Sequence, residues 1–372
     1  MSSAGTVDRT GLPDFPWDSL AGDQELARAH PGGIVDLSIG TPVDPVPAVV
    51  RAALAGPAAD IPGYPTTYGP ASLREAIADS LSRRFGITGA DPAAVLPTIG
   101  SKELIAWLPT LLGLGAGDLV VIPELAYPTY EVGARLAGAG FVRSDGLLGI
   151  GPRRTGLVWL NSPSNPTGRV LPVDHLRKVV AWARERGAVV ASDECYLGLP
   201  GVADPAPISV LHPDVCDGDH TGLLAVHSLS KTSNLAGYRA AFVAGDPALV
   251  SRLLEIRKHA GLIVPHPVQA AMAAAVADDA HVEAQRAIYD ARRVRLRAAL
   301  ESRGMRIEHS EAGLYLWATE GRPGRATVHD LAEQGVLVAP GEFYGPAGTE
   351  FVRVALSASD ERIDAAVERL TR

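Results

Sequence analysis

The sequence predicts an α/β protein with a three-layer large domain around a mostly parallel sheet, and a smaller α+β domain. Short apolar runs alternate with helix-length segments through the first two thirds of the chain. Strands buried on both faces read as continuous apolar runs, and their alternation with helices is typical of a parallel sheet covered on both sides. With 372 residues, the chain is also too long for one small core.

Five apolar runs predict the buried strands of the large sheet. Between them lie helix-length segments, such as 172–186, which begins at Pro172 and is followed by Gly187. Proline favours the first turn of a helix, and glycine favours the position after its end. The predicted strands are 118–123, 156–161, 188–194, 223–228 and 240–245.

The two ends of the chain have a different pattern. Residues up to about Ile34 are rich in proline and glycine, which indicates an arm rather than a domain. Residues 268–300 predict a long helix rich in Ala and Arg, broken at most once, that leads out of the main domain. A small α+β domain follows, with strands expected at 313–319, 335–340 and 351–357. The expected division is an N-terminal arm contributing to the small domain (1–35), a large domain (36–275) and a C-terminal small domain (276–372).

Composition and charge restrict the function classes. Hydrophobic residues make up 47% and charged residues 20%, a balance typical of a globular protein. The net charge of -8, with scattered Lys and Arg, disfavours nucleic acid and anionic membranes as partners. The first twenty residues lack the basic start and apolar run of a signal peptide, and no stretch approaches 18 uninterrupted apolar residues. Because Cys195 and Cys216 are the only cysteines and form no CxxC pair, we expect neither a disulfide framework nor a zinc site, and a cytoplasmic location.

Polar residues lie at or just past the ends of three predicted strands. Each alone has an ordinary explanation: Asp193 as a helix N-cap, Asn165 as a turn residue before Pro166, and Lys231 as a solvated loop cation. Ligands in parallel sheets bind beyond the carboxyl ends of the strands, which makes their joint occurrence informative. The residues concerned are Asn161, Asn165, Asp193, Ser228, Ser230 and Lys231.

This set of residue types suits the chemistry of a pyridoxal ring. A lysine whose pKa is lowered by burial and nearby cations is an amine nucleophile that forms a Schiff base with an aldehyde. The ring also needs a carboxylate opposite its pyridine nitrogen, and Asp193 is placed to supply it. A phosphate needs hydroxyls, backbone N–H groups at a helix start and a cation. The candidates for the phosphate are Gly100, Ser101, Lys102, Ser228 and Arg239.

An ordered set of motifs spans residues 36–360. It consists of SIGTPVDP, GYPTTYG, IGSKE, YPTY, NSPSNPTG, SDECY, SLSK, GYR and FVRVALS. This set resembles the fold type I, pyridoxal phosphate-dependent aminotransferases (class I/II) of the aspartate aminotransferase superfamily. The resemblance implies pyridoxal 5′-phosphate as cofactor, amino acid and 2-oxo acid substrates, and a homodimer with shared active sites.

The resemblance also implies a role for each matching residue. Lys231 would be the Schiff-base lysine and would move the proton of the substrate α-carbon. Asp193 would pair with the pyridine nitrogen, Tyr196 and Asn165 would hydrogen-bond the ring oxygen, and Tyr127 would stack on the ring.

The remaining matches imply binding of the phosphate and of the substrate. Ser101, Lys102, Ser228 and Arg239 would hold the phosphate, with help from Ser230. Tyr64 would reach the phosphate of the neighbouring subunit. Arg353 would bind the substrate α-carboxylate as a bidentate fork, together with the Gly40 backbone and the Asn165 amide.

Longer phrases, such as LPDFPWDSL, DLSIGTPVDPVP and HSLSKTSNLAGYRAAFVAGDP, are similar to the actinobacterial succinyldiaminopimelate transaminases. This implies conversion of N-succinyl-LL-2,6-diaminopimelate and 2-oxoglutarate to N-succinyl-2-amino-6-oxopimelate and glutamate, in lysine and diaminopimelate biosynthesis. Both substrates carry a second carboxylate, so a cation besides Arg353 is expected. Lys102, Arg28 and Lys258 remain open for this role. Transamination of aspartate or an aromatic amino acid, or C–S β-elimination on the same fold, remain alternatives.

Overall fold

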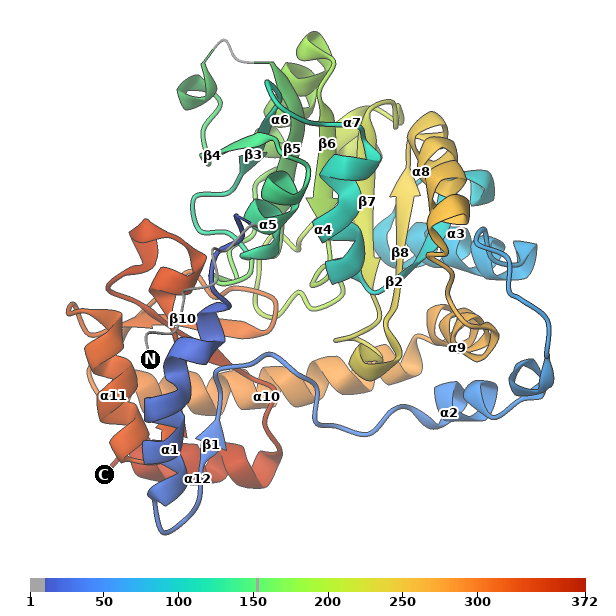
Figure 1. Ribbon diagram of the computed structural model, residues 1–372. Coiled ribbons are helices and arrows are strands. Elements are labelled where there is room, and N and C mark those ends of the chain that lie inside the picture. Colours follow the sequence, from blue (N-terminus) through green and yellow to red (C-terminus); the bar gives the residue numbers. More distant parts are fainter. Residues whose placement is uncertain (1–10, 152–153) are drawn as a thin grey trace, which may run out of the picture.

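A seven-stranded sheet forms the centre of the protein (Figure 1). The structure is a computed structural model that describes residues 11–151 and 154–372. The strand order is β2-β8-β7-β6-β5-β3-β4, and only β8 runs antiparallel to its neighbours. The strands are β2 (Val95–Ile99), β3 (Leu119–Ile122), β4 (Gly140–Arg143), β5 (Thr155–Asn161), β6 (Val189–Asp193), β7 (Leu223–Ser228) and β8 (Ala240–Gly245).

Helices cover both faces of this sheet. Successive strand residues point to opposite faces, so Leu224 and Val226 of β7 pack in one core and Leu223 and Ala225 in the other. The first core is closed by α4 (Ser101–Leu111), α5 (Thr129–Leu136) and α8 (Pro247–Ala260). The second is closed by α2 (Ala48–Leu54), α3 (Ala71–Phe85), α6 (Val173–Arg186), α7 (Pro213–Cys216) and α9 (His266–Ala277). The predicted three-layer α/β class is confirmed.

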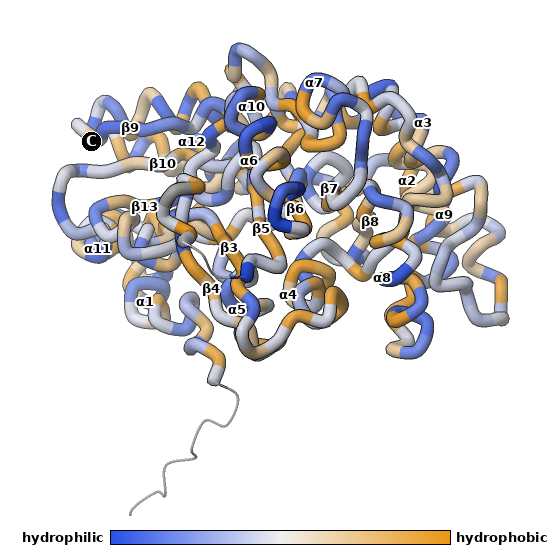
Figure 2. Tube along the Cα trace, turned by 90° about the horizontal axis from the view of Figure 1, so that it is seen from above, coloured by the Kyte–Doolittle hydropathy of each residue, from blue (hydrophilic) through white to orange (hydrophobic). Residues whose placement is uncertain are grey.

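All five predicted strands form, and two further strands complete the sheet. The edge strand β2 has the sequence VLPTI, and its Pro97 lacks the N–H that a central strand needs. The other edge strand, β4, is short and only partly buried. In Figure 2, the apolar strands β3 and β5 lie towards the middle of the molecule.

The C-terminal part contains a four-stranded antiparallel sheet in the order β12-β13-β10-β9. The long helix expected at 268–300 is broken once, at Asp278 and Asp279, between α9 and α10 (Ala280–Ser302). Asp279 pairs there with Arg83 and Arg84 of α3. The other elements are β9 (Arg306–Glu308), β10 (Tyr315–Thr319), α11 (Gly324–Glu333), β12 (Ala339–Pro340), β13 (Val352–Ala355) and α12 (Asp360–Leu370).

The N-terminal segment is more regular than its composition suggests. It contains a 3-10 helix (Pro16–Leu20), α1 (Ala21–Ala29) and β1 (Val35–Asp36), which pairs in parallel with β11 (Val336–Leu337). The carboxylate of Asp23 lies 3.0 Å from His329 of α11, so α1 is held against the C-terminal elements. Residues 1–10 lie outside the described residues, and the domain boundaries at 35 and 275 stay a prediction. Within the described part of the chain, no helix is long and apolar enough to cross a membrane.

Candidate active site

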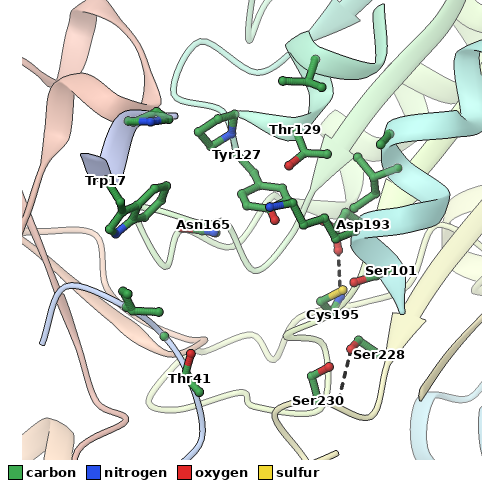
Figure 3. Close-up of a pocket in the computed structure, with 18 of the residues that line it drawn as sticks. Trp17, Thr41, Ser101, Tyr127, Thr129, Asn165, Asp193, Cys195, Ser228 and Ser230 are labelled. Carbon is green, nitrogen blue, oxygen red and sulfur yellow. Dashed lines mark hydrogen bonds between the residues drawn. The ribbon is translucent and has the colours of Figure 1, made fainter. Parts of the chain in front are cut away.

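A cavity of about 590 Å³ lies beyond the carboxyl ends of β5, β6 and β7, facing β10 and β13 (Figure 3). All the residues to which the resemblance assigns a role line it, except Tyr64, although they come from separate parts of the sequence. The candidates Gly100 and Asn161 are not among its lining residues. Tyr64 is 97% exposed and lies away from the cavity. The residues that meet there are Gly40, Ser101, Lys102, Tyr127, Asn165, Asp193, Tyr196, Ser228, Ser230, Lys231, Arg239 and Arg353.

Asp193 ends β6 and presents a buried carboxylate to the cavity. Its Oδ2 accepts a hydrogen bond of 2.8 Å from the Tyr130 hydroxyl, and its Oδ1 accepts one of 3.1 Å from the Cys195 backbone N–H. Burial raises the pKa of Asp193, while these hydrogen bonds act in the opposite direction. Among the described residues no cation pairs with it, so its arrangement fits a protonated ring nitrogen as partner.

Tyr130 was not singled out from the sequence. It is the second tyrosine of the YPTY motif, and its ring stacks on Trp159 with centroids 4.9 Å apart. Tyr127, the first tyrosine, lies perpendicular to it at 5.8 Å and lines the cavity, and burial raises the pKa of Tyr127 to about 12. The motif therefore supplies one ring to the cavity and one donor to Asp193.

Asn161 holds the two strand ends together. Its Nδ2 donates to the Asp193 carbonyl at 2.9 Å, and its Oδ1 accepts from the Asn165 N–H at 2.7 Å. The Asn165 side chain in turn accepts from Arg353 Nη1 at 2.8 Å. Asn161, Asn165 and Asp193, predicted at the ends of two neighbouring strands, are thus joined by hydrogen bonds that extend to Arg353.

Lys231 follows β7 and is largely enclosed. Its Nζ donates to the Gly40 carbonyl. Burial lowers the pKa of Lys231 to about 8, with further lowering from Arg353 and Arg239. A useful fraction of this amine is therefore uncharged, and nucleophilic, near neutral pH.

The first turn of α4 and the loops after β7 create an anion-binding corner. Ser101 and Lys102 open α4, where backbone N–H groups are free to bind an anion. Gly100 has a positive φ of 78°, which favours glycine, and a Cβ there would lie 2.7 Å from the Arg239 guanidinium carbon. Ser228 Oγ accepts from the Ser230 N–H at 3.1 Å on the same side (Figure 3). The donor set fits the phosphate of the expected cofactor.

Arg353 lies on β13, 2% exposed, and its guanidinium faces the cavity. Nη1 donates to Asn165 and Nη2 donates to the Ser38 carbonyl at 2.6 Å, while Nε is buried with no protein partner. Aromatic rings surround the group, with the centroid of Tyr315 at 4.0 Å and that of Tyr344 at 5.0 Å. Among the described residues, no carboxylate pairs with this buried guanidinium. An anionic ligand would therefore supply the opposite charge that it lacks.

Two aromatic contributions were missed at the sequence level. Tyr315 of β10 shares a 3.0 Å hydrogen bond with Tyr196, and a Cβ at Gly40 would lie 2.8 Å from its ring carbon Cζ. Residues 12–17 also line the cavity, which brings Phe15 and Trp17 to its outer wall. Phe15 and Trp17 lie in the phrase LPDFPWDSL, but nothing in it indicated a place in the site, because these side chains and Tyr315 reach the cavity only through tertiary packing.

Of the three cations considered for a second carboxylate, only Lys102 lines the cavity. Its Nζ lies 5.6 Å from the ring centroid of Phe15. Lys258 is instead paired with Glu255 at 2.6 Å, and Arg28 belongs to the last turn of α1.

A buried carboxyl group, that of Glu194, and a buried imidazole, that of His227, lie next to the site. Glu194 directly follows Asp193 in the sequence, and His227 directly precedes Ser228. Glu194 Oε2 is 3.3 Å from His227 Nε2, and the His227 ring stacks between Phe85 and Phe242. Burial raises the pKa of Glu194 to about 7 and lowers that of His227 to about 3. Both groups are therefore mainly uncharged at pH values between about 3 and about 7.

This pair predicts how stability depends on pH. The folded-state pKa of Glu194 is raised from 4.5 to about 7, so between these two pH values the folded protein keeps a proton that the unfolded chain has lost, and stability falls as pH rises from 4.5 to about 7. We expect Glu194→Gln to flatten this loss of unfolding free energy by up to about 1 kcal/mol per pH unit. Urea unfolding at a series of pH values from about 4.5 to about 8 measures this effect, and parallel curves for the two proteins across that window would contradict it.

Comparison with known proteins identifies the family. Residues 33–370 match the family model "Aminotransferase class I and II". The chain is 65% identical to the probable aminotransferase Rv1178 of Mycobacterium tuberculosis, over 97% of this chain and 85% of that protein. It is 59% identical to the 4-dedimethylamino-4-oxo-anhydrotetracycline transaminase OxyQ of Streptomyces rimosus, over 97% and 99%.

A solved structure agrees with this match. An aminotransferase from Neisseria meningitidis superposes with a TM-score of 0.87 and 29% sequence identity, covering 97% of each chain. The matched region includes the lysine, the buried carboxylate and the arginine described above. The chain belongs to the class I and II aminotransferases, which use pyridoxal 5′-phosphate.

Proposed function

We propose that this aminotransferase converts N-succinyl-LL-2,6-diaminopimelate and 2-oxoglutarate to N-succinyl-2-amino-6-oxopimelate and glutamate, in lysine and diaminopimelate biosynthesis. The observation that carries the proposal is the presence of two cations, Arg353 and Lys102, on one cavity. Arg353 is buried beside Asn165 and suits the α-carboxylate, while the exposed Lys102 at the mouth suits a second carboxylate. The two buried free cysteines are consistent with the proposed cytoplasmic location.

We assign the cofactor contacts as follows. Asp193 would hold the proton on the ring nitrogen, Tyr127 would cover one ring face, and Tyr196 and Asn165 would bind the ring oxygen. Ser101, Ser228, Ser230 and Arg239 would surround the phosphate, together with the backbone N–H of Lys102 in the first turn of α4, which leaves the Lys102 side chain free for the second carboxylate. When bound, pyridoxal phosphate supplies an aldehyde that condenses with amines and a ring that withdraws electrons. The support for these assignments is the shared cavity and its donor and acceptor pattern.

Arg353 would orient the substrate, and Lys231 would transfer its α-proton. The Arg353 fork fixes the α-carboxylate and so sets the direction of the α-C–H bond. The uncharged Lys231 amine, with a pKa of about 8, then takes the α-proton and returns it elsewhere on the same face. The buried position of both groups excludes water from this transfer.

We also propose a homodimer in which Tyr64 of each copy reaches the phosphate region of the other. Tyr64 is almost fully exposed in the single chain. Trp107 on α4 and Tyr238 beside Arg239 are also 43% and 40% exposed, close in sequence to cavity residues. A second copy would cover this apolar surface.

A second candidate substrate is a large cyclic ketone. Its support is the relative named for 4-dedimethylamino-4-oxo-anhydrotetracycline, together with the aromatic outer wall formed by Phe15 and Trp17. Flat ring systems pack well against such side chains.

Turnover rates with different amino acceptors distinguish the two candidate substrates. With glutamate as donor, we expect N-succinyl-2-amino-6-oxopimelate to be aminated with a higher kcat/KM than oxaloacetate, phenylpyruvate or a polycyclic ketone. Lys102→Gln is expected to lower this preference by about 10-fold, since one charge-assisted contact is lost. A cyclic ketone with the higher kcat/KM would favour the second candidate. Release of pyruvate and ammonia from cystathionine would favour the lyase.

A further inference from the structure

Residues 38–45, here called the crossing segment, connect β1 to α2 across the active-site cavity and have no regular secondary structure. Four of its carbonyls bind side chains from different parts of the protein. Ser38 O accepts from Arg353, Ile39 O accepts from Ser357 at 3.1 Å, Gly40 O accepts from Lys231 Nζ, and Pro45 O accepts from Asn234 at 3.1 Å. The position of this segment therefore bears on both substrate-facing cations.

One carboxylate anchors the far end of the crossing segment. Asp44 accepts two hydrogen bonds from Arg292 of α10, with Nη1–Oδ2 at 2.8 Å and Nη2–Oδ1 at 2.6 Å. Arg292 is 1% exposed. A bidentate pair of this kind fixes orientation as well as distance.

The same carboxylate is connected to the lysine loop. Asp44 Oδ2 also accepts from Gln285 Nε2 at 2.9 Å, and Gln285 Oε1 accepts from Asn234 Nδ2 at 2.8 Å. Asn234 lies three residues after Lys231 and has a positive φ of 55°. A continuous hydrogen-bonded path therefore joins Asp44 to the loop that carries Lys231.

We propose that Asp44 is a positioning residue for proton transfer. Through Arg292 and Gln285, it sets the place of the Gly40 carbonyl relative to the Lys231 loop. The Gly40 carbonyl then orients the free amine of Lys231 while this amine carries the α-proton. The inference rests on the proposed role of Lys231 as the base.

The two ends of the crossing segment are held by different residues. Loss of one end is therefore expected to affect proton transfer and substrate binding differently. Ser38 is fixed by Asp36, whose Oδ1 accepts from the Ser38 N–H at 2.9 Å and from its hydroxyl at 2.7 Å. Loss of Asp44 thus leaves the contacts of Ser38 with Arg353 and of Ile39 with Ser357 in place, but it removes the anchor on the other side of Gly40 and the Gln285 path to the Lys231 loop. Proton transfer is expected to suffer while binding of the α-carboxylate does not.

The test compares holoenzyme carrying Asp44→Asn with the parent, using glutamate and α-deuterated glutamate. We expect kcat to fall by about 10-fold or more, since small misplacements of a reacting group are costly. KM for glutamate should change by less than about 3-fold, and the isotope effect on kcat should rise because proton transfer becomes slower. Asp364→Asn is the matched control, because it removes an exposed carboxylate that pairs with Arg295 on the same helix α10. The control should keep the parental values.

Parental kcat and isotope effect in Asp44→Asn would overturn the inference. If this variant unfolds, Gln285→Leu tests the inference in its place. This substitution removes the hydrogen bond from Asn234 to Gln285 and leaves the Asp44–Arg292 pair intact. The isotope effect should again rise, by a smaller amount, and an unchanged value would refute the role. A parent that does not transaminate glutamate would instead defeat the proposed function.

Discussion

Replacing Lys231 with methionine is expected to abolish turnover and to stabilise the cofactor-free chain. Methionine keeps the length of the side chain but has no amine to condense with the cofactor or to carry a proton. Because nucleophile and base are lost together, kcat should fall by about 10⁴-fold or more. The rate of 2-oxoglutarate formation from glutamate measures this loss, and turnover at the parental rate would contradict the assignment.

The gain in stability has a separate physical cause. Burial lowers the pKa of Lys231 from its ordinary value to about 8, so holding the ammonium in the fold costs free energy at neutral pH. A lowered pKa means that stability is lost as pH falls through about 8. At 1.36 kcal/mol per unit, methionine should add up to about 3 kcal/mol at pH 7, and this gain should shrink as pH rises towards 10.

Urea unfolding of the cofactor-free proteins at pH 7 and pH 10 tests this expectation. Lys258→Met is the control, since Lys258 is exposed, lies outside the cavity and pairs with Glu255. It should keep parental kcat and change stability by less than about 0.5 kcal/mol. Equal stability effects for the two lysine variants would show that Lys231 is not destabilised by burial.

Arg353→Lys is expected to lower kcat/KM for glutamate by about 100-fold or more. A lysine cannot bind a carboxylate as a fork, and it cannot reach both Asn165 Oδ1 and Ser38 O, which would lose their donors. Each charge-assisted hydrogen bond lost in a buried site costs about 1.5–3 kcal/mol, so the loss of two corresponds to at least this factor.

A donor without a carboxylate makes the test specific. For an aliphatic amine of the same chain length, parent and Arg353→Lys should react at similar, slow rates. Arg325→Lys serves as the control, because Arg325 binds Glu342 and Ser19 on the surface of the small sheet region. A loss for the amine as large as the loss for glutamate would mean that Arg353 supports the fold rather than the carboxylate.

The sheet could largely be predicted because buried parallel strands leave a strong local pattern. The runs at 156–161, 188–194 and 223–228 match β5, β6 and β7 within one residue at each end. Strand β2 lacked such a pattern, because Pro97 interrupts it and only its edge position tolerates this. The helix α1 was missed because the flanking Pro and Gly residues indicated a loop, while its packing against α11 stabilises it.

The site residues likewise fall into those that lie in sequence motifs and those that only tertiary packing brings to the cavity. Asp193, Lys231 and Arg353 lie in motifs with recognisable order, so the sequence predicted that they would meet, and they line one cavity. Tyr315 and Trp17 join them through packing between segments far apart in the sequence, as in the hydrogen bond between Tyr196 and Tyr315, so their place in the site could not be predicted locally. Asp44 was seen only as part of SIGTPVDP, and its contacts with Arg292 depend on tertiary structure.

In the proposed reaction, the amino group passes from donor to enzyme and then to acceptor. The most direct test mixes the purified holoenzyme with ¹⁵N-glutamate alone, and adds N-succinyl-2-amino-6-oxopimelate only after glutamate has been removed. We expect one 2-oxoglutarate per site in the first step, a changed absorption of the bound cofactor, and transfer of the ¹⁵N to the succinylated product in the second. Free ¹⁵N-ammonia, or no 2-oxoglutarate until both substrates are present, would contradict it.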